Sequence, residues 1–145
     1  MRKLAFDLGT KSCGFAITDE NEIISSGLVN FTMSENDFEA VFNKVHKFMN
    51  EYKIDGFVIG YPTKISGQKS ERTIMVEEFS QKLYQRFKIP FLFVNEQYST
   101  KKTQENLINI GLSSKKRKAI KDKMAAQLIL QDYLDYHKNK WSKNE

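Results

Sequence analysis

Three short strand-like segments fill the first 31 residues and leave no room for a helix between them. The segments cover about 4–8, 13–18 and 23–31, and the turns between them have the sequences Gly-Thr-Lys-Ser and Asp-Glu-Asn-Glu. These residue types accept turn geometry, so the pattern predicts a β-meander. The chain therefore starts as a sheet, and after Phe31 the spacing of apolar residues changes to that of helices.

The rest of the chain alternates between helical and strand-like patterns. We expect helices at about 35–52 with Ser34 as the cap, 70–87, 99–111 and 122–137, and strands at 56–60 and 91–94. A helix-length connection favours a parallel, right-handed crossover, so the two later strands should lie parallel to the first strand. The sequence therefore predicts an α/β fold, with a mixed five-stranded sheet flanked by helices on both faces.

Length and composition limit the chain to one domain. Its 145 residues are 40% hydrophobic and 12% aromatic, which suits a single domain with its own core. We place this domain at residues 1–138 and a polar, frayed C-terminal tail at 139–145. The single Cys13 excludes an internal disulfide, and one cysteine with two histidines cannot form a Cys/His zinc site. Without a signal-peptide core or a membrane-length apolar segment, we expect a cytoplasmic protein with no membrane partner.

Two carboxylates lie where strands of the predicted sheet end. Asp7 is near the end of the first strand, and Glu96 ends the last one. Both should emerge at the carboxyl ends of the parallel strands, where the active sites of such sheets usually lie. The alternatives are that Asp7 caps the following turn and that Glu96 is a solvated loop residue.

A third carboxylate, Asp122, falls on the apolar stripe of the last helix. At ~100° per residue, Ala126 and Ile129 lie within about 40° of it. The Asp122 carboxylate should therefore point at the protein, and capping of the helix start is the alternative. By the same count Asp132 and Asp135 lie away from the stripe, and we expect both to be solvated.

A cluster of these three carboxylates would need a counter-charge, because isolated buried carboxylates are costly. Mg²⁺ or Mn²⁺ suits it, since both are hard cations that take oxygen ligands. Two such ions ~3.5–4 Å apart can activate a water and stabilise the leaving oxygen during phosphodiester cleavage. The residues Asp7, Glu96 and Asp122 therefore predict a metal-dependent catalytic site.

Basic residues surround this predicted site in the sequence, and the net charge is +5. Lysine and arginine next to metal-bridged carboxylates can hold the phosphates of a nucleic-acid backbone, although a charge run can also be simply a solvated face. The residues that we assign to nucleic-acid binding are Lys11, Lys64, Arg72, Lys101, Lys115, Lys116, Arg117 and Lys118.

Four motifs in order carry a family resemblance. They are Phe-Asp-Leu-Gly-Thr-Lys at 6–11 with Gly-Phe-Ala at 14–16, Gly-Tyr-Pro at 60–62 with Gly67, Glu96 with Ser99 and Thr100, and Asp122 with Ala125 and Ala126. The pattern resembles the YqgF family of bacterial RNase H-like nucleases, also called RuvX, over nearly the whole chain.

The resemblance implies an RNase H-like, RuvC-like fold and an endonuclease that processes the 5′ end of pre-16S rRNA in ribosome biogenesis. It also carries an older interpretation as a Holliday junction resolvase, so the implied partners are pre-rRNA, pre-ribosomal particles or branched DNA. By the same resemblance, Asp7, Glu96 and Asp122 match the acidic metal-binding positions of the family.

Two other functions stay open at this point. Where the family usually has Asp-Glu-Arg, this chain has Asn95-Glu96-Gln97, which favours a non-catalytic module that binds nucleic acid with the same basic face. Residues 7–11 also resemble the phosphate loop of actin-like ATPases and sugar kinases. Those proteins enclose a nucleotide between two such domains, and this chain has the length of one.

Overall fold

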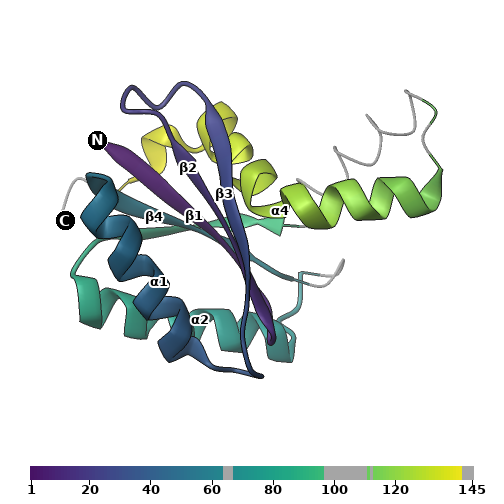
Figure 1. The fold of residues 1–145 in the computed structure, drawn as a ribbon, viewed down its shortest axis with the longest axis horizontal. Helices are drawn as coiled ribbons and strands as arrows, with labels where there is room; N and C mark the ends of the chain where they lie inside the picture. Colours follow the sequence, from purple (N-terminus) through teal and green to yellow (C-terminus); the bar gives the residue numbers. More distant parts are fainter. Residues whose placement is uncertain (64–66, 97–110, 112, 142–145) are drawn as a thin grey trace.

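Five strands form one mixed sheet, with α1 and α2 against one face and α4 against the other (Figure 1). This computed structural model describes residues 1–63, 67–96, 111 and 113–141, without the side chains at 117–123. The strands are β1 (Arg2–Leu8), β2 (Ser12–Thr18), β3 (Ser25–Thr32), β4 (Ile54–Tyr61) and β5 (Phe91–Asn95). Their spatial order is β3-β2-β1-β4-β5.

Strand directions follow the sequence prediction. β2 is antiparallel to both β1 and β3, which makes the meander. β4 is parallel to β1, and β5 is parallel to β4. The predicted mixed five-stranded sheet is therefore confirmed, and the carboxyl ends of β1, β4 and β5 meet at one edge.

The described helices are α1 (Phe38–Glu51), α2 (Glu71–Phe87), α4 (Ser114–Tyr136) and a short 3₁₀ helix, η1 (Lys138–Lys140). α4 begins inside the basic run, which is earlier than the sequence predicts. The helix predicted at 99–111 lies outside the described residues except for its last position. No helix in the described ranges has the length and apolarity to cross a membrane.

The start of α1 corrects one prediction, since Asp37 caps this helix in place of Ser34. The Asp37 carboxylate accepts a hydrogen bond from the backbone N–H of Ala40 at 3.3 Å. Asn36 has a left-handed φ of 57°, which breaks the helical path before Asp37. Its backbone N–H donates to the carbonyl of Thr10 at 2.7 Å, so this turn also ties α1 to the meander.

The two faces of the sheet carry side chains of different size. Strand residues alternate between faces, so Phe6 points toward α1 and α2 while its neighbours Ala5 and Asp7 point toward α4. On the first face, the Phe6 ring lies 5.2 Å from that of Phe15 and 5.9 Å from that of Phe79 in α2. The second face is lined by small or slender residues that pack against α4: Ala5, Ala16, Val58 and Val94. Large aromatic side chains therefore fill one layer, and α4 can lie close to the other.

A buried lysine fixes the C-terminal half of α4 at the start of the parallel strands. The Lys3 side chain is 8% exposed, and its Nζ lies 3.1 Å from Glu22 Oε2 and 2.7 Å from Asp55 Oδ1. Tyr133 of α4 donates its hydroxyl to Glu22 Oε1 at 2.8 Å and accepts from Trp141 Nε1 at 2.7 Å. Trp141, in the segment expected to be a frayed tail, is thus part of this packed cluster.

Asp132 corrects a second prediction. This side chain is 6% exposed, and its Oδ2 lies 3.4 Å from His137 Nε2, because the chain turns back after α4 and covers it. Asp135 is exposed as predicted, and it accepts a hydrogen bond from Gln131 Nε2 at 3.0 Å.

Replacing Lys3 with Met should destabilise the protein by about 2 kcal/mol or more, because the partly buried Glu22 carboxylate and the more exposed Asp55 lose their counter-ion. The matched control is Arg86→Gln, which breaks a 2.6 Å pair with Glu39, a side chain that is 61% exposed. That change should cost about 1 kcal/mol or less. Urea denaturation at neutral pH measures both, and equal losses would contradict the role given to Lys3.

Candidate active site

Asp7 and Glu96 lie on the same face of the sheet, at the edge where the parallel strands end. Asp7 is two residues beyond Ala5 in β1, and Glu96 is two residues beyond Val94 of β5. Because residues two apart in a strand lie on the same face, both carboxylates lie on the face that Ala5 and Val94 present to α4. The structure therefore brings together two of the three acidic residues predicted from the sequence.

Gly60 makes room for this convergence, and Gly14 lies beside it. A Cβ on Gly60 of β4 would lie 2.5 Å from Glu96 Oε1 and 2.6 Å from Ile129 Cδ1. Only glycine at this position therefore allows the Glu96 and Ile129 side chains to pack against the backbone of β4. A Cβ on Gly14, the β2 partner of Asp7, would lie at ordinary contact distances, 3.6 Å from the Cβ of Asp7 and 3.5 Å from that of Ala126, so Gly14 shows that these two residues lie close together. The two carboxylates and α4 thus meet over backbone that carries no side chain.

Asp122 lies four residues before Ala126 in α4, one helical turn toward the N-terminal end of the helix. Since Ala126 sits next to Gly14 and Asp7, the backbone of this turn approaches the same edge. The Asp122 side chain lies outside the described residues. Within the described part of the chain, no group of three or more His, Cys, Asp or Glu side chains is close enough to hold a metal.

Arg72, in the first turn of α2, joins the two carboxylates. Its Nη2 lies 3.2 Å from Asp7 Oδ1, and its Nη1 lies 3.3 Å from Glu96 Oε2. The guanidinium also donates to the carbonyl of Leu8, at 2.9 Å from Nη2 and 3.3 Å from Nε. The Arg72 side chain is 43% exposed, compared with 25% for Asp7 and 16% for Glu96.

The cap of α2 determines where Arg72 lies. Ser70 and Thr73 form a reciprocal capping box at the start of this helix. The Thr73 hydroxyl also donates to the carbonyl of Pro62, in the loop that follows β4. This contact holds the first turn of α2 beside the strand ends, and Arg72 with it.

Burial and the adjacent Asp7 carboxylate raise the pKa of Glu96 to about 8, although Arg72 acts in the opposite direction. At neutral pH the metal-free protein therefore keeps a proton on Glu96. The pair is short of positive charge even with Arg72 present, which is the electrostatic condition under which a carboxylate site gains most from a cation.

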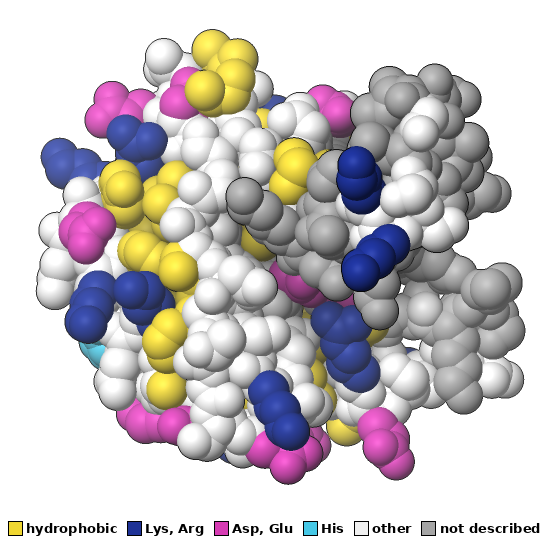
Figure 2. Space-filling model, turned by 45° about the vertical axis from the view of Figure 1, so that its right-hand side comes forward, with side chains coloured by type: hydrophobic (Ala, Val, Ile, Leu, Met, Phe, Trp, Pro, Cys, Tyr) yellow, Lys and Arg dark blue, Asp and Glu magenta, His cyan; other side chains and the backbone are white. Residues whose placement is uncertain are grey.

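The predicted nucleic-acid contacts occupy several places. Lys11 is exposed in the turn between β1 and β2, and Lys115 and Lys116 are exposed in the first turn of α4. Figure 2 shows acidic side chains recessed on this side of the molecule with Lys and Arg side chains near them. Outside the described part lie the residues Lys64 and Lys101 and the side chains of Arg117 and Lys118.

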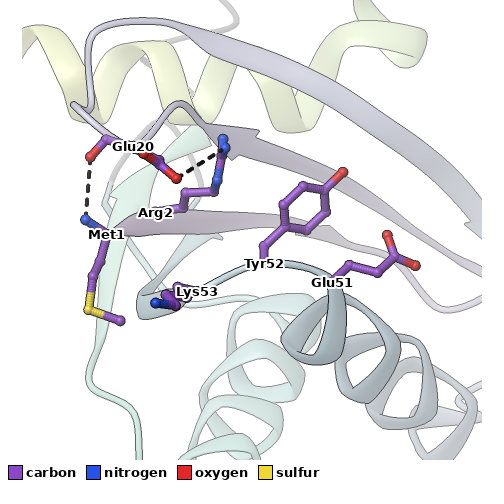
Figure 3. A pocket seen from close by; sticks show the side chains of 6 residues that line it. All are labelled: Met1, Arg2, Glu20, Glu51, Tyr52 and Lys53. Carbon is purple, nitrogen blue, oxygen red and sulfur yellow. Dashed lines mark hydrogen bonds and ion pairs between the residues drawn. The ribbon is translucent and has the colours of Figure 1, made fainter.

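A separate cavity of about 560 Å³ opens at the other end of β1 (Figure 3). It is lined by Met1, Arg2, Glu20, Glu51, Tyr52 and Lys53. The Met1 ammonium donates to the carbonyl of Glu20 at 3.3 Å, and Arg2 lies 4.0 Å from the Glu20 carboxylate. This cavity lies at the opposite end of β1 from Asp7, so we do not place it in the candidate site.

Replacing Glu96 with Gln should remove a pH dependence of stability. The folded, metal-free protein keeps a proton on Glu96 up to about pH 8, whereas the unfolded chain loses it near the ordinary value of 4.5. The folded state binds the extra proton between these values, so stabilisation present below about pH 4.5 is lost as the pH rises through about 8.

Urea denaturation in EDTA at about pH 5 and about pH 8.5 measures this effect. The unfolding free energy of the unmodified protein minus that of Glu96→Gln should decrease by a few kcal/mol over this range. A difference that does not change with pH would mean that Glu96 is ionised throughout.

Comparison with known proteins places the chain in a family. Residues 1–136 match the family model described as "RuvX: Holliday junction resolvase". A protein of Ureaplasma parvum serovar 3, named "Putative pre-16S rRNA nuclease", is 49% identical over 141 residues, with 92% of this chain and 96% of that protein covered. A protein of the same name from Mycoplasmopsis synoviae is 41% identical, with 95% and 100% covered.

The solved structures show the same fold. RuvC from Thermus thermophilus, bound to a Holliday junction substrate, matches with a TM-score of 0.55 at 9% identity, over 94% of this chain and 97% of that one. A second structure of that protein gives a TM-score of 0.53 at 11% identity, over 93% and 96%. The predicted RNase H-like, RuvC-like fold is therefore confirmed, the names of the relatives support the predicted nuclease function, and the chain belongs to the RuvX (YqgF) family.

Proposed function

We propose that this protein is a divalent-metal-dependent endonuclease that cuts structured nucleic acid, and that its substrate is the 5′ end of pre-16S rRNA. The observation that carries this proposal is the meeting of Asp7 and Glu96 beneath α4, at the strand edge where active sites of such sheets lie. The names of the curated relatives support the choice of RNA. Action in the cytoplasm, on pre-ribosomal particles, belongs to the same proposal.

The donor set suits Mg²⁺ or Mn²⁺. Asp7 and Glu96 offer carboxylate oxygens, which these hard cations prefer, and the pair lacks positive charge. Asp122, one turn from Ala126, is our third ligand. When bound with substrate, two such ions would supply an activated water and stabilise the leaving oxygen.

The chain's own residues have to bind and orient the nucleic acid. Lys115 and Lys116 extend from the start of α4, and Lys11 extends from the turn that follows Asp7. We assign these exposed cations to the backbone phosphates of the substrate. We assign the same task to Lys64, Lys101, Arg117 and Lys118.

Two alternatives have specific support. The family description favours a Holliday junction resolvase. A non-catalytic binding module is favoured by Asn95, which stands where the family usually has an acid. Its Nδ2 donates to Thr63 Oγ1 at 3.1 Å, so this side chain stabilises the strand edge where an acid could have held a cation.

Asp7→Asn and Asp122→Asn should each lower cleavage by about a hundredfold or more, because a metal-dependent step loses a ligand. The measurement compares a pre-16S rRNA fragment with a four-way DNA junction in Mg²⁺, Mn²⁺ or EDTA. Asp135→Asn is the matched control, since Asp135 is exposed on the same helix and contacts Gln131.

The outcomes separate the three functions. Metal-dependent cutting of RNA supports the proposal, and cutting of the junction alone supports the resolvase. Salt-sensitive binding without cleavage or metal dependence supports the binding module. Cleavage at the unmodified rate by Asp7→Asn would contradict the assignment of the site.

A further inference from the structure

We propose that Arg72 is a resident counter-ion of the carboxylate pair, and that a divalent metal has to displace its guanidinium in order to bind. This inference rests on the proposed metal-dependent function and goes beyond it. It gives Arg72 a role at the metal site itself, in addition to the phosphate contact predicted from the sequence.

Arg72 contacts three of the four side-chain oxygens of the pair. Three carboxylate oxygens of the pair lie within 3.5 Å of its terminal nitrogens: Asp7 Oδ1, Glu96 Oε1 and Glu96 Oε2. Both oxygens of Glu96 are among them, so a metal ion held by Asp7 and Glu96 would share at least one oxygen with the guanidinium. The guanidinium and a divalent ion therefore compete for one set of acceptors.

Electrostatics makes the two cations mutually exclusive. A guanidinium carries its charge at every accessible pH, so it cannot yield by losing a proton as a lysine can. A divalent ion at the same oxygens would lie within a few ångströms of this charge and be repelled by it. Arg72 has to move if both oxygen groups are to bind the metal.

Arg72 has both the freedom and the space to move. Its side chain is 43% exposed, and its only other hydrogen bonds among the described residues are with the Leu8 carbonyl. It also borders a cavity of about 490 Å³, whose lining includes Glu71 and Glu78. Glu71 and Glu78 place acceptors in that cavity for a displaced guanidinium.

Lys3 shows what a permanent counter-ion looks like in the same fold. Lys3 also joins two carboxylates, those of Glu22 and Asp55, but its side chain is only 8% exposed and lies over the ring of Trp141. A metal could not replace Lys3 without opening the core. Arg72 bridges its pair from the solvent-exposed side, so it can exchange with another cation without disrupting the core.

The test is the affinity for Mn²⁺ alone, measured by calorimetry without nucleic acid, so it does not depend on cleavage. Arg72→Gln should bind Mn²⁺ about tenfold tighter than the unmodified protein, because a competing charge is gone. Arg72→Lys, which keeps the charge but loses the two-point contact, should lie between them. Arg86→Gln removes the same charge from the far end of α2, where Arg86 pairs with Glu39, and should leave the affinity unchanged.

Equal or weaker Mn²⁺ binding by Arg72→Gln would overturn the inference, since Arg72 would then support the site or act elsewhere. If that variant does not fold, as judged by circular dichroism in EDTA, the order of Arg72→Lys and the unmodified protein decides. Metal-dependent cleavage with no gain in affinity would reject the role of Arg72 and leave the proposed function intact. Absence of Mn²⁺ binding in every variant would reject both.

Discussion

The repulsion between two carboxylates brought to one edge of the sheet is the constraint on which the rest of this structure depends. β1 and β5 bring Asp7 and Glu96 to a place that is largely closed to water, where the Asp7 carboxylate opposes the ionisation of Glu96. Without a metal, the protein meets this cost with a proton on Glu96 and with Arg72. Replacing such a pair with apolar residues would increase the stability of the fold. The presence of the pair therefore indicates a functional site.

The surrounding packing serves to keep that pair in place. Large aromatic side chains fill the face that carries α1 and α2, while glycine and alanine on the other face let α4 approach the strand ends. The position of α4 is then fixed from its far end, where Tyr133 and Trp141 join the Lys3 cluster, and along its length, where Gln127 donates to the carbonyl of Ser25 at 3.2 Å. The helix that carries Asp122 is therefore anchored by contacts well away from the acidic edge.

The sequence predicts the sheet and the meeting of Asp7 and Glu96, because strand alternation and parallel crossovers follow from short local patterns. It does not predict the partner of Arg72, since the direction of an arginine depends on how the capped start of α2 docks on the loop after β4. The same limit explains the two corrections. Asp37 replaces Ser34 as a cap because of the left-handed turn at Asn36, and Asp132 is buried because His137 folds back over it. Neither the turn at Asn36 nor the contact of Asp132 with His137 can be predicted from helical periodicity alone.

A carboxylate pair that already holds a cation has a consequence for the order of events in catalysis. Because Arg72 offsets part of the negative charge of the pair without metal, a free metal ion has to compete with a charge that is already bound. A nucleic-acid phosphate changes this balance, since it adds negative charge beside the site and offers a new acceptor for the displaced guanidinium. By linkage, phosphate that favours the displaced state of Arg72 must also favour the metal. If Arg72 is displaced as we propose, the binding of metal and the binding of substrate would be coupled through this one side chain.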